Sequence, residues 1–162
     1  MPKVPFPHMM VHDTPLFASF VLTPDARPYT RWEFDVQVGD GHVTRAEWDP
    51  DVFRTAYDVS KLRIDAVGWQ GGIPTVFEVK PMGRISGFGQ LMAYKYFYRR
   101  DKGLEPNLAY ITDWMPPDVA TVCAAYGIRV FIVGEATEDE LLAACRIVQA
   151  DCSQLIRLPT LP

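Results

Sequence analysis

The chain has 162 residues, 48% of them hydrophobic, which is enough for one globular domain with a sizeable core. With 22% charged residues and a net charge of −4, the composition excludes a disordered or low-complexity chain. The cysteines (Cys123, Cys145 and Cys152) lack Cys-x-x-Cys spacing, which argues against a disulfide scaffold or zinc knuckle. No apolar stretch near the start is long enough for a signal peptide or membrane span, so a cytoplasmic protein without a membrane segment is expected.

The first 30 residues are rich in proline, which donates no backbone hydrogen bond and interrupts helices. We therefore predict an extended arm over residues 1–30, with one short strand over residues 17–22. A single domain is expected over residues 31–158, followed by a short tail over residues 159–162.

The rest of the chain alternates between strand and helix patterns. Residues 31–38 alternate apolar and polar side chains and predict a half-buried strand. Residues 43–48 fit a returning strand, while Pro50 could open a short helix reaching residue 57. Further strands are predicted over residues 62–69, 75–80, 107–114 and 128–134, and helices over residues 86–100, 116–127 and 138–156. This order predicts an α/β fold with a central mixed β-sheet flanked by helices.

The pair Gly71 and Gly72 fixes the register of the hairpin over residues 62–80, because a two-residue loop of this kind favours glycine. If these residues form the loop, Asp65 lies opposite Glu78. Two opposed carboxylates repel each other unless a cation neutralises them. Lys80 shares the face of Glu78, since side chains on a strand alternate with a period of two.

An Asp, Glu and Lys cluster of this kind suits hydrolysis of a phosphodiester by a water that Mg²⁺ activates, with Mn²⁺ as a substitute. Carboxylate oxygens are ligands for such hard ions, and the Lys80 ammonium could orient the water or offset developing charge. The alternative is a surface hairpin whose Glu78 and Lys80 are merely solvated or weakly paired.

The motifs RIDAVG, EVK and GQLMAY together resemble the PD-(D/E)xK nuclease superfamily, and Gln90 with Tyr94 resembles the Q-x-x-x-Y pattern of its RecB-like branch. The resemblance implies a restriction-endonuclease-like core, with Gln90 and Tyr94 beside the catalytic sheet and the DNA. Ile64 departs from the pattern, which has proline there. The roles that the resemblance implies are metal ligands at Asp65, Glu78 and the Val79 backbone carbonyl, and a catalytic lysine at Lys80.

Many members of this superfamily supply a further acidic ligand from upstream, and Glu33 and Glu47 compete for that role here. Basic residues concentrate near the motifs: six of the 16 Lys and Arg residues lie in residues 80–102, against the single acid Asp101. Arg84 and Lys95 are therefore predicted to contact DNA phosphates. The cations at the end of the helix could equally complement its dipole.

The leading hypothesis is a Mg²⁺-dependent DNA endonuclease for DNA processing, recombination, repair or phage DNA metabolism. It would act as a homodimer or as a component of a larger nucleoprotein or viral assembly, in which case it could be virion-associated. The alternative is a non-catalytic structural or DNA-binding module that retains the nuclease fold, for example in a phage particle or a transposition complex.

Overall fold

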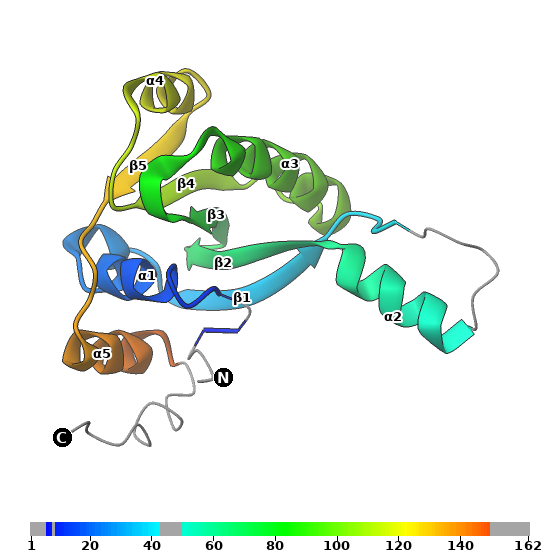
Figure 1. Ribbon diagram of the computed structural model, residues 1–162, viewed down its shortest axis with the longest axis horizontal. Helices are drawn as coiled ribbons and strands as arrows, with labels where there is room; N and C mark the ends of the chain where they lie inside the picture. The colour runs from blue at the N-terminus through cyan, green and yellow to red at the C-terminus, as the bar shows by residue number, and fades with distance from the viewer. Residues whose placement is uncertain (1–5, 8, 43–49, 150–162) are drawn as a thin grey trace.

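The computed structural model describes residues 6–7, 9–42 and 50–149 (Figure 1). The helices are α1 (Thr14–Val21), α2 (Pro50–Ser60), α3 (Ile85–Lys102), α4 (Pro117–Ala125) and α5 (Glu138–Val148), with short 3₁₀ turns η1 (Pro24–Ala26) and η2 (Pro81–Gly83). The strands are β1 (Arg31–Val38), β2 (Leu62–Gln70), β3 (Ile73–Val79), β4 (Asn107–Thr112) and β5 (Ile128–Ile132).

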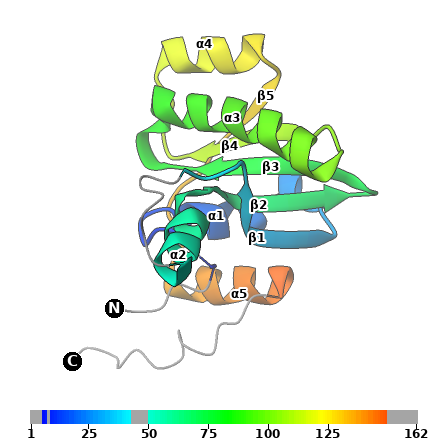
Figure 2. The same cartoon turned by 90° about the vertical axis from the view of Figure 1, so that its right-hand side faces the viewer.

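The strands form one mixed sheet in the order β1-β2-β3-β4-β5. The first three strands pair antiparallel, whereas β3, β4 and β5 pair parallel. Helices α3 and α4 cover one face of this sheet and α1 and α5 the other (Figure 2). The predicted α/β fold, a mixed sheet flanked by helices, is confirmed.

Apolar side chains fill the space on both sides of the sheet, because successive residues of a strand point to opposite faces. Phe77 and Val79 pack with α1 and α5, while Val76 packs with α3 and α4. Cys145 lies buried in the first of these clusters and Cys123 in the second, both as free thiols. Strand β3 is thus held from both faces, and this fixes the position of the residues at its end.

The extended arm and the strand predicted before residue 31 are wrong, because residues 14–21 form helix α1. Pro15 stands in the first turn, where its missing N–H costs no hydrogen bond. Phe17 and Phe20 are fully buried between the sheet and α5, and Phe6 packs against Phe17 with ring centroids 5.0 Å apart. Phe6 and the buried residues of α1 therefore belong to the core, and the density of prolines misled the prediction.

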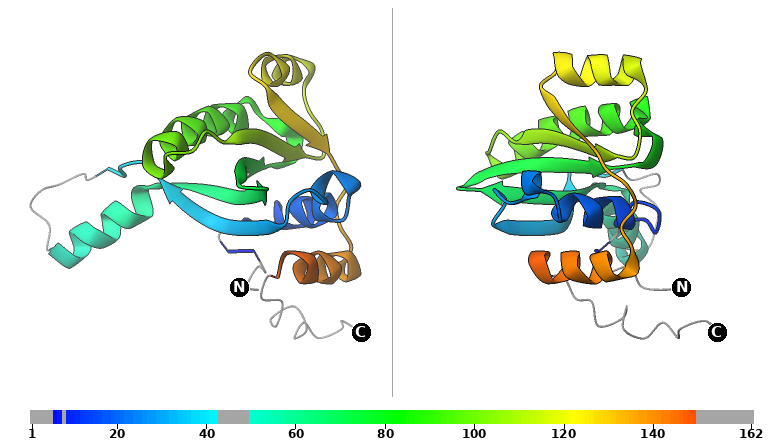
Figure 3. Two further views of the ribbon diagram at one scale, coloured as in Figure 1. Left: turned by 180° about the vertical axis from the view of Figure 1, so that it is seen from behind. Right: turned by 90° about the vertical axis from the view of Figure 1, so that its left-hand side faces the viewer.

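The segment between β1 and β2 contains helix α2, which projects away from the sheet (Figures 1 and 3). The short helix predicted from Pro50 is therefore confirmed, while residues 43–49, where a returning strand was the alternative, lie outside the described part of the chain. Ser60 closes the base of this excursion, since its Oγ accepts from the His42 N–H at 2.7 Å and donates to the His42 carbonyl at 3.1 Å. No described helix is long and apolar enough to cross a membrane.

The hairpin of β2 and β3 has the predicted register. Gln70 pairs with Ile73 and Ala66 with Phe77, and Asp65 and Glu78 are the residues that follow this last pair. Gly71 and Gly72 have φ values of 54° and 84°, the left-handed region that glycine adopts without steric cost.

Helix α3 packs so closely against β4 that one added methyl group at the contact would clash. A Cβ atom at Gly87 would stand 2.2 Å from the Tyr110 hydroxyl, whereas one at Gly89 would meet nothing within 4 Å. We expect Gly87→Ala to destabilise the protein by about 1–3 kcal/mol through overpacking. Gly89→Ala should instead stabilise it by up to about 1 kcal/mol, because alanine favours helix. Urea unfolding measures both free energies, and equal effects of the two variants would contradict this packing.

Candidate functional site

The predicted Asp, Glu and Lys cluster forms at the carboxyl end of β3. Beyond the last β2–β3 pair, the Asp65 Oδ2 atom accepts a hydrogen bond of 2.9 Å from the Val79 N–H. The Asp65 carboxylate is thereby fixed beside Glu78, whose charge raises the pKa of Asp65. The register of the hairpin therefore brings the two acids together.

Glu78 is the most constrained member of the cluster, with a residue exposure of only 2%. Its Oε1 atom accepts from the Lys80 ammonium at 2.9 Å. Its Oε2 atom is buried and accepts no hydrogen bond from the described residues, because the nearby Tyr94 hydroxyl, which lowers the pKa of Glu78, donates its proton to the Arg63 carbonyl. A buried acceptor that lacks a partner costs on the order of 1–3 kcal/mol, and more when it is charged. A cation bound at Oε2 would remove that cost.

Helix α3 holds the lysine in place through a chain of hydrogen bonds. The Lys80 Nζ atom donates to Gln90 Oε1 at 2.7 Å, and Gln90 Nε2 donates to the Tyr94 hydroxyl at 3.2 Å. That hydroxyl donates in turn to the Arg63 carbonyl of β2 at 2.9 Å. The predicted pair Gln90 and Tyr94 thus reaches the site, where it orients Lys80 against the sheet.

A third carboxylate, Asp13, was missed by the sequence analysis. It is the N-cap residue of α1 and is 8% exposed, yet its side chain makes no capping hydrogen bond to that helix. Its charge raises the pKa of both Asp65 and Glu78, while the Lys80 charge lowers the pKa of Asp13 against the larger effect of burial. An acidic residue followed by Thr14 and Pro15 is a helix-start signal, which could have drawn attention to this position.

Glu33, the first of the upstream acids predicted from the sequence, does not take this place. Glu33 lies on β1, where its Oε1 pairs with Arg31 at 3.1 Å and its Oε2 accepts from Trp69 Nε1 at 2.9 Å. Both oxygens are engaged, so the structure does not bring Glu33 to Asp65 and Glu78. The second candidate, Glu47, lies outside the described residues.

The electrostatics of the site favour a bound cation. Burial, followed by the Glu78 charge, holds the pKa of Asp65 well above its ordinary value. Burial also raises the pKa of Glu78, although the Lys80 ammonium opposes that effect. The oxygen donors suit a hard ion such as Mg²⁺, which keeps several of its waters. The described residues contain no preformed group of three or more acidic, His or Cys side chains arranged to hold a metal.

The two predicted phosphate contacts have different surroundings. Arg84 is the exposed N-cap residue of α3 and lines the same hollow as Asp13 and Lys80. Lys95 follows Tyr94 on α3 and pairs with Glu105 at 3.2 Å. Arg84 therefore lines the candidate site, whereas the charge of Lys95 is engaged by Glu105.

The basic residues at the end of α3 are largely neutralised by acids from other segments. Arg99 pairs with Glu105, and both guanidinium nitrogens NH1 and NH2 of Arg100 donate to Asp40 at 2.8 Å. Asp101 also accepts from Arg100 and from the Gly39 N–H. The net positive charge along α3 is therefore smaller than the sequence indicates.

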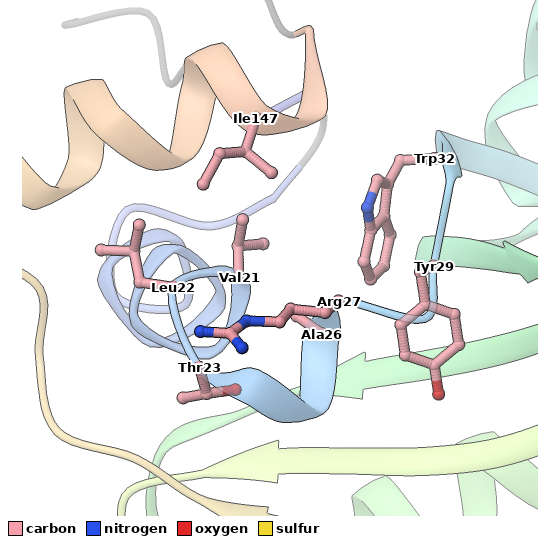
Figure 4. A pocket seen from close by; sticks show the side chains of 8 residues that line it. All are labelled: Val21, Leu22, Thr23, Ala26, Arg27, Tyr29, Trp32 and Ile147. Atoms are coloured by element: carbon pink, nitrogen blue, oxygen red, sulfur yellow. The ribbon is translucent and has the colours of Figure 1, made fainter.

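Two hollows of different character lie near α1. The first, of about 560 Å³, contains Asp13 and Lys80 and is lined by Met10, His12, Asp13, Lys80, Pro81, Met82, Arg84 and Glu135. The second, of about 300 Å³, lies between α1, η1 and α5 and is lined mainly by apolar side chains, with Arg27 as its charged member (Figure 4). The first hollow combines acids and bases, so it is the candidate site for chemistry.

No family model matches the sequence, and no curated protein matches it. Among solved structures, the chain is similar to a repair endonuclease from Pyrococcus abyssi, with 11% identity and a TM-score of 0.42 over 64% of this chain and 40% of that one. It is also similar to EndoMS in a complex with double-stranded DNA, with 11% identity and a TM-score of 0.46 over 78% and 47%. A protein of unknown function matches with 12% identity and a TM-score of 0.44 over 86% and 72%. The match spans less than half the length of the two endonuclease chains.

Asp65→Asn should stabilise the metal-free protein at neutral pH. Burial, followed by the Glu78 charge, raises the pKa of Asp65, which means that its ionised form is less favourable in the folded protein than in the unfolded chain. The contribution of Asp65 to the free energy of unfolding is therefore fully present below its pKa in the unfolded chain, about 3.9. This contribution is lost as the pH rises through the higher pKa of Asp65 in the folded protein. Thermal unfolding in a chelator at pH 7 should give the variant a midpoint about 2–4 °C higher, the change expected for about 1 kcal/mol. A midpoint equal to or below that of the wild type would contradict the buried, unneutralised charge.

Proposed function

We propose that the protein is a Mg²⁺-dependent DNA nuclease of the PD-(D/E)xK type, with Mn²⁺ as a substitute ion. The observation that carries this proposal is the buried Glu78 Oε2 atom without a hydrogen-bond partner among the described residues, next to Asp65 and a fixed Lys80. The RIDAVG, EVK and GQLMAY motifs, whose residues meet at this point, support it further.

Asp65, Glu78 and the Val79 carbonyl would hold the ion, and Asp13 is the upstream acid that would complete the set. A bound ion of this kind lowers the pKa of its water and offsets negative charge in the transition state. Lys80 is held by Glu78 and Gln90, so its ammonium would be ready to orient the attacking water or to contact the phosphate. Arg84 would bind a neighbouring phosphate at the rim of the hollow.

DNA is the proposed substrate, and endonucleolytic cutting in DNA processing, recombination, repair or phage metabolism is the proposed role. Among the described residues, Lys80 and Arg84 line the hollow, while acids such as Asp40 and Glu105 pair with the basic residues further along α3. A second copy of the chain or a partner within a larger assembly would extend the surface that binds the phosphate backbone.

One observation favours the second candidate function, a DNA-binding or structural module without catalysis. The described residues contain no preformed group of three or more metal-binding side chains. A module of that kind would keep the ion pair of Glu78 and Lys80 for structural reasons alone.

The nuclease proposal predicts cleavage of circular single-stranded or supercoiled double-stranded DNA in Mg²⁺ or Mn²⁺ but not in a chelator. Lys80→Ala should reduce the rate by about 10²–10⁴-fold, the range for a positioned proton-transfer or charge-stabilising group. Lys102→Ala, at the far end of α3, is the matched control and should cut normally. Cleavage that survives in Lys80→Ala would contradict the proposed site.

The identity of the upstream acid can be tested by two matched neutral substitutions. Asp13→Asn removes a charge that interacts with Asp65 and Glu78, so metal-dependent cleavage should fall by about 10-fold to 100-fold. Glu33→Gln removes a carboxylate bound to Arg31 and Trp69 and should leave the rate within about twofold of the wild type. Metal titrations of the cleavage rate compare the two variants, and the reverse pattern would restore Glu33 as the ligand.

A further inference from the structure

The loops that follow β3 and β4 carry exposed apolar side chains at the edge of the sheet where the carboxylates lie. Met82 is 53% exposed and Trp114 is 55% exposed, and Met10 on the segment before α1 is 67% exposed. Met10 and Met82 line the hollow that also contains Asp13 and Lys80. Single exposed apolar side chains are common on protein surfaces, but apolar side chains gathered at the edge of a charged hollow are typical of a binding site.

Met82 is held in this exposed position by the backbone. Its φ of 60° lies in the left-handed region, which residues other than glycine rarely adopt. The Met82 N–H donates to Asp113 Oδ1 at 2.7 Å, and the Gly83 N–H donates to Thr112 Oγ1 at 2.8 Å. Two hydrogen bonds from the end of β4 thus impose a conformation that the sequence alone does not favour.

Trp114 is fixed to the same structure. Its carbonyl accepts from the Thr112 hydroxyl at 3.0 Å, and a Cβ atom at Gly83 would stand 2.6 Å from that carbonyl oxygen. The backbones of the two loops therefore touch, and glycine is required at position 83 for this contact. Two exposed side chains, Met82 at the hollow and Trp114 on the loop whose backbone contacts it, are together called the apolar rim.

From this arrangement we propose that the substrate strand is unpaired or unstacked where it enters the site, with the apolar rim contacting its exposed bases. The proposal rests on the nuclease function proposed above. Phosphates would meet Lys80 and Arg84, while Met82 would insert beside a base and Trp114 would offer a stacking surface. Apolar side chains that insert between bases, and aromatic ones that stack on them, are general means of holding such DNA.

The placement of the rim favours DNA over a protein as its occupant. Met10 and Met82 share one hollow with Lys80, Arg84 and Asp13. A protein that covered these side chains would also cover the groups that the scissile phosphate must reach. A fully paired duplex presents phosphates to the cations but keeps the faces of its bases stacked, so it would leave the rim unused.

The test is a binding measurement with the full-length protein in Ca²⁺, a hard ion used here to occupy the carboxylates. Fluorescence anisotropy would compare labelled oligonucleotides of one sequence as a single strand, a duplex with an internal bulge, and a fully paired duplex. The single strand and the bulged duplex should bind about 5-fold to 150-fold more tightly than the paired duplex, the range for stacking of one base.

Met82→Gly and Trp114→Ala should each remove most of this preference without weakening binding of the paired duplex. The glycine variant also relieves the left-handed backbone, so it is expected to fold. Tyr126→Ala is the matched control, because Tyr126 is 58% exposed at the end of α4, and it should keep the full preference. Equal affinities for all three DNAs, or a preference that survives in both rim variants, would overturn the proposal.

The two proposals fail separately in these experiments. Binding is read without cleavage, so metal-dependent cutting by a protein that shows no preference contradicts only the role of the rim. A preference that depends on Met82, in a protein whose cleavage is absent or insensitive to Lys80→Ala, supports the rim and contradicts the nuclease.

Discussion

The structure depends on a buried carboxylate that the chain itself only half neutralises. Glu78 is fixed by a strand packed on both faces, and Lys80 two residues later engages one of its oxygens. Asp65 and Asp13 add further negative charge from β2 and α1. A fold optimised for stability alone would replace such a group by an apolar side chain. The presence of this buried carboxylate is understandable if a cation and a phosphate complete the site.

The loops after β3 and β4, at the same edge of the sheet, contain a second energetically unfavourable feature. These strands run parallel, so their carboxyl ends lie side by side, and Asp113 and Thr112 can reach the loop that follows Lys80. The left-handed Met82 and the buried Glu78 are therefore neighbours along one strand end. Unfavourable local structure of this kind tends to gather at functional sites, where the rest of the fold maintains it.

The part of the site that the sequence predicted is the part that local geometry determines. Two glycines set the hairpin register and so the meeting of Asp65 with Glu78, and helical spacing set Gln90 beside Tyr94. The part that was missed depends on contacts between distant segments. Asp13 reaches the cluster only because α1 packs under the sheet, and the prolines around that helix indicated an arm instead. Likewise, acidic residues in loops pair with the basic residues of α3. The positions of these acids in space cannot be predicted from the periodicity of the sequence.

The central claim is that Asp65 and Glu78 together bind a divalent metal ion. The most direct measurement is a crystal structure of the protein grown with Mn²⁺, with anomalous scattering recorded to locate the ion. We expect an anomalous peak between these two carboxylates, with oxygen distances of about 2.0–2.3 Å and the Glu78 Oε2 atom among the ligands. Mn²⁺ bound elsewhere in a protein that cleaves DNA, or a Glu78 Oε2 atom that remains without a ligand at saturating Mn²⁺, would contradict it.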